Sequence, residues 1–149
     1  MPVEQALTQA AQSVLEMMFF AGTEPGSRAT GSGELQVEVR FDGLRRGALI
    51  LEMPERCARA MAASFAGVPE AEALPQEAVH QVAAELSNMI CGATLARVEP
   101  NGLFKLSAPL VRPAAGRAAL EPEPSECWLQ IPAMENGLLH LALILMENA

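Results

Sequence analysis

Apolar side chains recur at three- and four-residue spacings in three stretches of the chain, which is the period of an amphipathic helix. The first runs from about Val3 to Ala21, with Ala6, Ala10 and Val14 on one face. A short stretch from Pro54 to Phe65 begins with a proline, a residue favoured in the first turn of a helix. The longest, about Gln76 to Arg97, ends before a Pro-Asn-Gly sequence. The pattern therefore predicts three helices.

Alternating or continuous runs of apolar residues predict five strands. They cover about Leu35 to Phe41, Gly47 to Met53, Leu103 to Leu106, Cys127 to Ile131 and Leu138 to Met146. An Asn-Gly pair just before the last run is typical of a hairpin turn. The last run is almost entirely apolar, so we expect it at the centre of the sheet, buried on both faces.

Two segments rich in Gly, Pro, Ser and Thr, at about 22–33 and 113–124, are predicted to be loops. The order of elements indicates an α+β fold with the two long helices packed on one face of an antiparallel sheet. Aligning Leu15 with Leu86 places Met17 on Asn88 and matches apolar positions around them. This alignment indicates a faint internal repeat.

A chain of 149 residues, half of them hydrophobic, is expected to form one domain over residues 1–149. Its net charge of −8 argues against binding to nucleic acid or to anionic lipid. No apolar run reaches the roughly 18 residues that a membrane-spanning helix needs, and the N-terminus lacks the pattern of a signal peptide. Three widely spaced cysteines indicate reduced thiols, so we expect a cytoplasmic protein.

The long helix carries an unusual polar stripe. Gln81, Glu85, Asn88 and Gly92 fall on one narrow face, almost opposite its apolar residues, and Glu85 and Asn88 are neighbours at i,i+3. Asn is a poor residue for a helix interior, and Gly is about 1 kcal/mol less favourable there than Ala. The missing side chain at Gly92 would let a partner approach closely. The plain alternative is a surface helix that tolerates these residues, because a Glu-x-x-Asn pair is too short to be specific by itself. The opposite face is formed by Val79, Val82, Leu86, Ile90, Ala93 and the stem of Arg97.

The surrounding sequence, AVHQVAAELSNMICGA, closely resembles the signature helix of the CheC/CheX family of chemotaxis phosphatases. That family carries Glu-x-x-Asn on a long exposed helix, then a glycine, and about twenty residues later a proline after a strand. Here these are Glu85, Asn88, Gly92 and Pro109. FDGLRRGALILEMP is similar to the hairpin of the same family. The resemblance covers nearly the whole chain and implies the CheX-like α+β fold.

A single motif resembles the CheX branch rather than the two-motif CheC branch, since Val14 and Met17 stand where the first helix would carry a second motif. The family commonly has an acidic or small hydroxyl residue four positions before the glutamate. Here Gln81 keeps the polarity but not the charge, which bears on activity and on partner choice.

The resemblance implies a substrate, the phosphorylated aspartate of a CheY-like response regulator in two-component signalling. The regulator would hold Mg²⁺, and this chain would bind no cofactor. Asn88 would orient the attacking water and Glu85 would pair with the regulator's active-site lysine, with Gln81 and Gly92 in the contact surface. A homodimer is also implied.

A binding module without catalytic activity on the same fold stays open as an alternative, because a fold does not decide activity. Other chemistry finds little support in the sequence. His80 and His140 have no cysteine or carboxylate at ligand spacing, so no metal site is expected, and His140 is predicted to be a core histidine. Ser87 lies about 100° away from the polar stripe, which argues against a nucleophile there.

Overall fold

The computed structural model describes residues 2–19, 27–29, 35–67, 74–113, 128–132 and 138–146. Three helices and seven strands are present there. The helices are α1 (Val3–Phe19), α2 (Glu55–Ala66) and α3 (Gln76–Val98). The strands are β1 (Ser27–Ala29), β2 (Leu35–Gly43), β3 (Arg46–Met53), β4 (Phe104–Leu106), β5 (Leu110–Pro113), β6 (Trp128–Pro132) and β7 (Leu138–Met146).

The predicted helices and five predicted strands are confirmed, with small differences at their ends. Two short strands were not predicted. β1 lies inside a segment predicted to be a loop and pairs with β6, while β5 follows β4 and pairs with β2. With three or four residues each, they are too short to give a periodic pattern and depend on the strand beside them. The proposed internal repeat stays a prediction.

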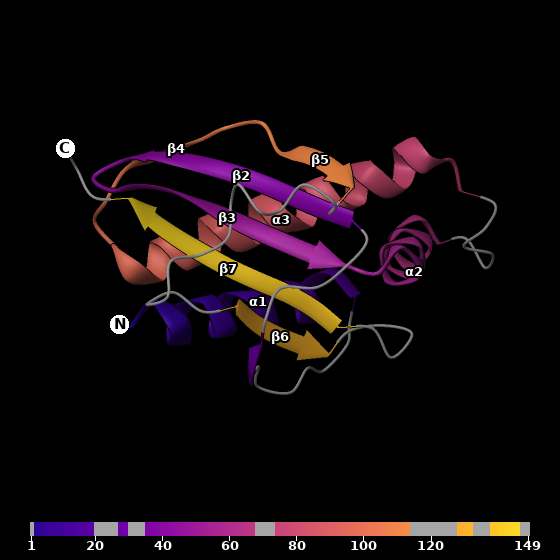
Figure 1. Cartoon of the computed structure of the whole chain (residues 1–149), viewed down its shortest axis with the longest axis horizontal. Helices are drawn as coiled ribbons and strands as arrows, with labels where there is room; N and C mark the ends of the chain where they lie inside the picture. The colour runs from indigo at the N-terminus through magenta and orange to yellow at the C-terminus, as the bar shows by residue number, and fades with distance from the viewer. Residues whose placement is uncertain are drawn as a thin grey trace.

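The strands form one sheet in the order β1-β6-β7-β3-β2-β4, with β5 also on β2, and every described pair is antiparallel. Strand β7 lies between β6 and β3, which confirms its predicted central position (Figure 1). It is buried on both faces, since Leu141 and Leu143 belong to the main core while Ala142 belongs to a small cluster on the other side.

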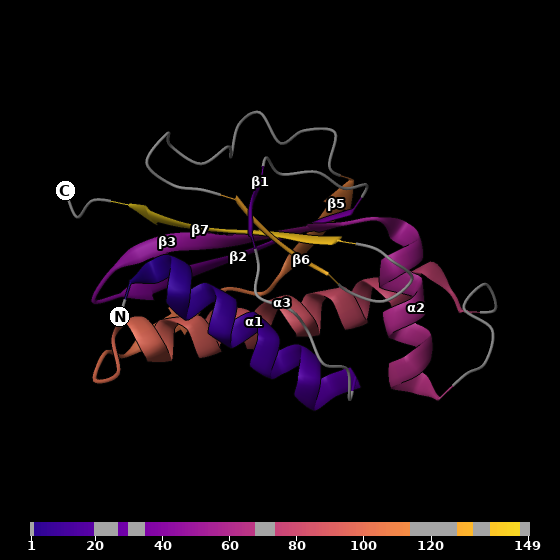
Figure 2. The same ribbon diagram turned by 90° about the horizontal axis from the view of Figure 1, so that it is seen from below.

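All three helices lie on the same side of the sheet, which confirms the prediction made for the two long ones (Figure 2). Alternate residues of β2 and β3, such as Val37 and Leu51, point to this side and pack with the apolar faces of the helices. The faces of α1 and α3 that meet this core include Leu7, Leu86 and Ile90, all of them almost fully buried. This single core holds α3 against the strands along its length.

The opposite face of the sheet carries a row of polar residues that the sequence pattern did not predict. Gln36 donates to the buried carboxylate of Glu52 over 2.8 Å, and Arg112 donates to Gln36 over 2.7 Å. Glu52 lies opposite His140 where β3 pairs with β7, so the row of polar residues continues into β7. Glu38 is also buried and forms ion pairs with Arg40 and Arg112. Glu52 thus accepts a hydrogen bond from a buried amide, and Glu38 lies within 4 Å of two guanidinium groups, although its Oε1 accepts no hydrogen bond among the described residues.

Gly47 is required by packing. A Cβ atom added there would lie 1.9 Å from the carbonyl oxygen of Ile144 and 2.7 Å from the ring of Phe41. We therefore expect Gly47→Ala to lower the free energy of unfolding by about 1–3 kcal/mol, as overpacking of a core does. Urea denaturation measures this change. The control is Gly92→Ala, where the added atom meets nothing within 4 Å; equal losses in both variants would contradict the assignment.

Cys91 lies on the buried face of α3, and burial raises the pKa of its thiol from 9.0 to about 12. In the native protein we expect no reaction of Cys91 with a thiol reagent at pH 8, because the thiolate is the reactive form. The raised pKa also means that the folded state keeps a proton which the unfolded state loses. Stability should therefore fall as the pH rises from about 9 to 12, by at most about 1.4 kcal/mol per pH unit.

Peptide mapping after labelling checks the first result, and urea denaturation across this pH range checks the second. A Cys91→Ala variant, which lacks the thiol with the raised pKa, should show a shallower pH dependence. Rapid labelling of Cys91 in the folded protein would contradict the buried position of its thiol.

Candidate docking and catalytic site on α3

Helix α3 follows Pro75, has 23 residues and spans about 35 Å at 1.5 Å per residue. The predicted polar stripe does face outward: Gln81 and Glu85 are exposed, and Asn88 and Gly92 are half-buried. The predicted apolar face meets the core, since Val79, Leu86 and Ile90 are buried there and the half-buried Val82 and Ala93 pack against it. The residues buried on α3 are Val79, Ala83, Leu86, Ser87, Ile90, Cys91, Thr94 and Leu95.

The buried face is broader than predicted. It includes two hydroxyl residues, Ser87 and Thr94, which satisfy their hydrogen bonds within the helix. Ser87 donates to the carbonyl of Ala83 over 2.9 Å, and Thr94 donates to the carbonyl of Ile90 over 2.7 Å. A hydroxyl bound in this way can be buried without a large penalty. Ser87 is thus buried and already bonded, in keeping with the prediction that it is no nucleophile.

Glu85 and Asn88 lie one helical turn apart on the outer side of α3, and Gln81 lies one turn before Glu85. Among the described residues, none of these three side chains has a hydrogen-bond or ion-pair partner. A carboxylate, a carboxamide and a second amide are therefore presented to the outside by a helix whose other side is held in the core. Such side chains can donate to and accept from another molecule without first breaking internal bonds.

Gly92 continues the same stripe one turn after Asn88. A Cβ atom built there meets no atom within 4 Å, so neither packing nor backbone geometry calls for glycine. In a helix interior glycine is about 1 kcal/mol less favourable than alanine. Gly92 therefore lowers the stability of the helix, and no contact among the described residues requires it. Its missing side chain leaves the surface beside Asn88 open to a partner.

Pro109 lies at the edge of the sheet that α3 covers. Residues 107–109 join β4 to β5 and stand opposite only two residues of β2, a β-bulge. Ser107 anchors this bulge, because its amide donates to the carbonyl of Arg40 and its hydroxyl accepts from the amide of Arg40. Helix α3 packs against β2, β4 and β5, the strands that meet at this bulge (Figure 1).

Other candidate chemistry lies away from this stripe. His80, on α3, contacts the side chain of Gln76 at 2.9 Å, and Gln76 in turn accepts from Arg59 of α2. Within the described ranges, no group of three or more His, Cys, Asp or Glu residues could hold a metal ion. Cys127 lies outside the described residues. No helix of the described part is long and apolar enough to cross a bilayer.

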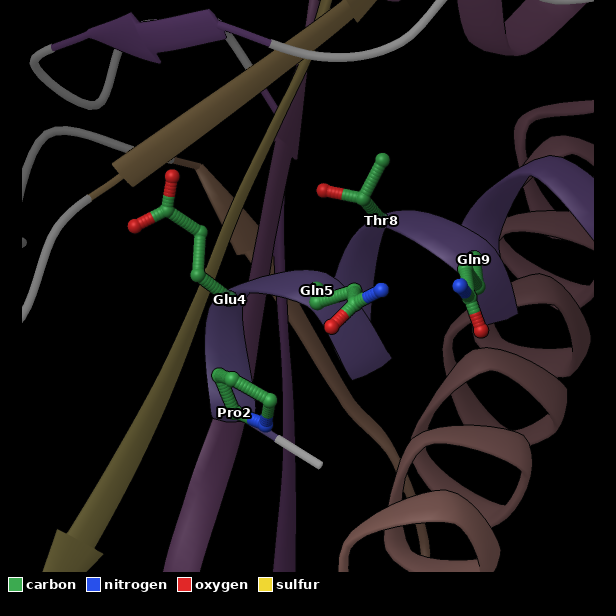
Figure 3. Close-up of a pocket in the computed structure, with 5 residues that line it drawn as sticks. All are labelled: Pro2, Glu4, Gln5, Thr8 and Gln9. Carbon is green, nitrogen blue, oxygen red and sulfur yellow. The ribbon is translucent and has the colours of Figure 1, made fainter.

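A shallow pocket lies on the outer side of the first turns of α1 (Figure 3). It contains none of the predicted site residues, and its lining side chains come from one helix and the residue before it. They are Pro2, Glu4, Gln5, Thr8 and Gln9. This pocket is an open helix surface rather than an enclosed site.

Comparison with known proteins places the chain in a family. The chain matches the family model "Chemotaxis phosphatase CheX" over residues 36–132, which includes the whole of α3. A search among curated proteins found no significant match.

Solved structures share the fold at low sequence identity. A chain of the CheX-CheY-BeF3-Mg complex from Borrelia burgdorferi is 16% identical, with a TM-score of 0.77 over 98% of this chain and 99% of that one. CheX from Vibrio vulnificus is 17% identical, with a TM-score of 0.78 over 98% and 97% of the two chains. CheX from Desulfovibrio desulfuricans is 19% identical, with a TM-score of 0.74 over 97% and 99%.

The family model spans well over half of the chain, from β2 to β6, and these structures show the same fold. The expected CheX-like α+β architecture is therefore confirmed. The chain belongs to the CheX family of chemotaxis phosphatases.

Proposed function

We propose that this protein hydrolyses the aspartyl phosphate of a CheY-like response regulator, with Asn88 and Glu85 as its functional side chains. The observation that carries the proposal is the outward stripe of α3. These two residues stand there one turn apart, without partners among the described residues, beside a glycine for which packing gives no reason. Membership of the CheX family and the fold shared with a chain of a CheX-CheY complex support the choice of substrate.

In this proposal the carboxamide of Asn88 orients the attacking water. Its oxygen accepts a hydrogen bond from the water, and its NH₂ group donates to a phosphoryl oxygen. The water oxygen attacks phosphorus in line, the bond between phosphorus and the aspartate oxygen breaks, and the regulator recovers a free carboxylate while inorganic phosphate leaves. Positioning of this kind is the main contribution that a protein makes to phosphoryl transfer. Mg²⁺ on the regulator would neutralise the phosphoryl charge.

Glu85 has a different role in the same proposal. Its exposed carboxylate pairs with the regulator's active-site lysine, which fixes the register of docking and draws that lysine away from the phosphoryl group. Gln81 and Gly92 lie on either side of the pair and belong to the contact surface. The chain itself holds no cofactor, acts as one domain in the cytoplasm and forms a homodimer.

Substitution of the two residues should separate their roles. We expect Asn88→Ala to lower the rate of phosphate release by about 10²-fold, by analogy with the loss of a single preorganised hydrogen-bonding group. Glu85→Ala should abolish most of the acceleration at low regulator concentration, because docking is lost. Phosphate release from phosphorylated CheY-like regulators of the source genome measures both effects.

Glu77→Ala is the matched control, since Glu77 is an exposed glutamate in the first turn of the same helix. All variants should melt near the wild-type temperature, because the removed side chains have no partner among the described residues. An unchanged rate in Asn88→Ala would rule out its proposed role. Binding of the regulator without any acceleration by the wild-type protein would favour the non-catalytic docking module.

Gly92 gives an independent test of the docking surface. Gly92→Ala should raise the free energy of unfolding by up to about 1 kcal/mol, because it improves helix propensity and meets no neighbour. Gly92→Trp should also fold, yet the large ring beside Asn88 should block the partner and reduce activity by at least about tenfold. Urea denaturation and phosphate release measure the two properties. Full activity in Gly92→Trp would show that no partner approaches this part of α3.

A further inference from the structure

The core holds the start of α3 less firmly than it holds the rest of the helix. Of the eight buried residues of α3, only Val79 lies in the segment 76–82, and the other seven lie at 83–95. The weakly buried segment carries Gln81 of the polar stripe, and Glu85 follows it by one turn. Contacts outside the core therefore matter more for the position of this end of the stripe.

Helix α2 supplies such a contact through Arg59. It packs beside the N-terminal end of α3 (Figure 2). The guanidinium of Arg59 donates through Nη1 to the carbonyl oxygen of Leu74 over 3.0 Å and through Nη2 to Oε1 of Gln76 over 2.7 Å. Its Nε also lies 3.6 Å from the carboxylate of Glu55. Because Pro75 at the N-cap makes no side-chain hydrogen bond, Arg59 ties the first turn of α3 to α2 in its place.

The donor properties of arginine fix the state of His80. An arginine side chain only donates hydrogen bonds, so the side-chain oxygen of Gln76 faces Arg59 and the NH₂ group faces the other way. There Nε2 of Gln76 lies 2.9 Å from Nε2 of His80. Two N–H groups cannot bond to each other, so Nε2 of His80 accepts, and the ring is neutral with its proton on Nδ1. We call Arg59, Gln76 and His80 the interhelix network.

A proton added to His80 breaks this network. Histidine is the side chain that ordinarily gains its charge between pH 8 and pH 5. The protonated Nε2 would turn an N–H group toward the NH₂ group of Gln76 and add a second cation near Arg59. A loss of the bond between Gln76 and His80 leaves the start of α3 with fewer contacts to α2.

The other charged residues around the network leave this argument intact. Glu55 is already paired with Arg59, and Glu77 precedes His80 by one turn of α3. The charged residues of the strands that α3 contacts alternate with core residues and lie on the sheet face turned away from the helices. The remaining charged residues of the three helices are half-buried or exposed, namely Glu4, Glu16, Arg56, Glu85 and Arg97.

We propose that the interhelix network positions the start of α3 for docking of the response regulator, and that protonation of His80 weakens this docking. The inference rests on the proposed function, which supplies the partner. A shift of the first turns of α3 displaces Gln81 most and Glu85 less, while Asn88 lies in the part of the helix that the core holds. Arg59 is thus a positioning residue, which acts through α3 and touches no reacting group.

The first experiment reads the network without any partner. Nitrogen NMR of the imidazole of His80 at pH 8 should show the proton on Nδ1 and an unprotonated Nε2. In Arg59→Ala the amide of Gln76 is free to rotate, so both tautomers should appear. Arg56→Ala is the matched control, because Arg56 is an exposed arginine of the same helix without a partner among the described residues. A protonated Nε2 in the wild-type protein at pH 8 would overturn the inference.

The second experiment measures docking by calorimetric titration with regulator carrying Mg²⁺ and BeF₃⁻. We expect Arg59→Ala to raise Kd about three- to tenfold at pH 8, the effect of about one hydrogen bond, with kcat at saturation unchanged. Arg56→Ala should leave Kd unchanged. Gln76→Ala, at an exposed position, gives the same test if Arg59→Ala does not fold.

The pH dependence separates positioning from a merely structural role. Between pH 8 and pH 6, Kd should rise more for the wild-type protein than for His80→Gln, whose amide oxygen accepts from Gln76 but does not titrate. Any pH dependence of the regulator itself is common to both proteins.

An unchanged Kd in Arg59→Ala and Gln76→Ala, or the same pH dependence in wild type and His80→Gln, would overturn the inference. If the wild-type protein binds the regulator without releasing phosphate, the proposed function fails while Kd still decides the positioning role. If it binds no CheY-like regulator, the proposed function and the docking role both fail.

Discussion

The burial of one side of α3 is the constraint on which the rest of the structure depends. Leu86 and Ile90 are almost fully buried in the core that this helix shares with β2, β3 and α1. A helix has 3.6 residues per turn, so burying these positions necessarily turns Glu85 and Asn88 outward. The sheet and the two other helices thus hold a pair of polar side chains in a fixed orientation before any partner arrives, which lowers the entropy lost on docking.

The outer face of α3 lowers local stability. Asn88 and Gly92 are both unfavourable in a helix interior. In the described part of the chain no contact compensates for either, since the Asn88 side chain has no hydrogen bond there and a Cβ atom at position 92 would meet nothing within 4 Å. Residues that violate local preferences without an internal reason tend to mark functional sites.

The long elements and the polar stripe could be predicted from the sequence because periodicity records which side of an element is buried. Short strands such as β1 and β5 could not, since their pairing depends on distant strands. The buried Glu38 and Glu52 were also not predictable. Glu38 occupies a polar position of the alternating pattern of β2, which normally faces water, and Glu52 interrupts the apolar run of β3. Only the fold brings Arg112 and Gln36 beside them.

For the candidate site, helical spacing predicted the outward position of Glu85, Asn88 and Gly92, and their roles stay proposals. The bulge at residues 107–109 was not predictable, since it depends on how β4 and β5 pair with β2. The most direct test of the central claim is a single-turnover measurement of phosphate release from a phosphorylated CheY-like regulator at saturating concentrations of this protein. The account predicts rapid release with the wild-type protein and release at nearly the regulator's own rate with Asn88→Ala. Equal rates for the two proteins would contradict it.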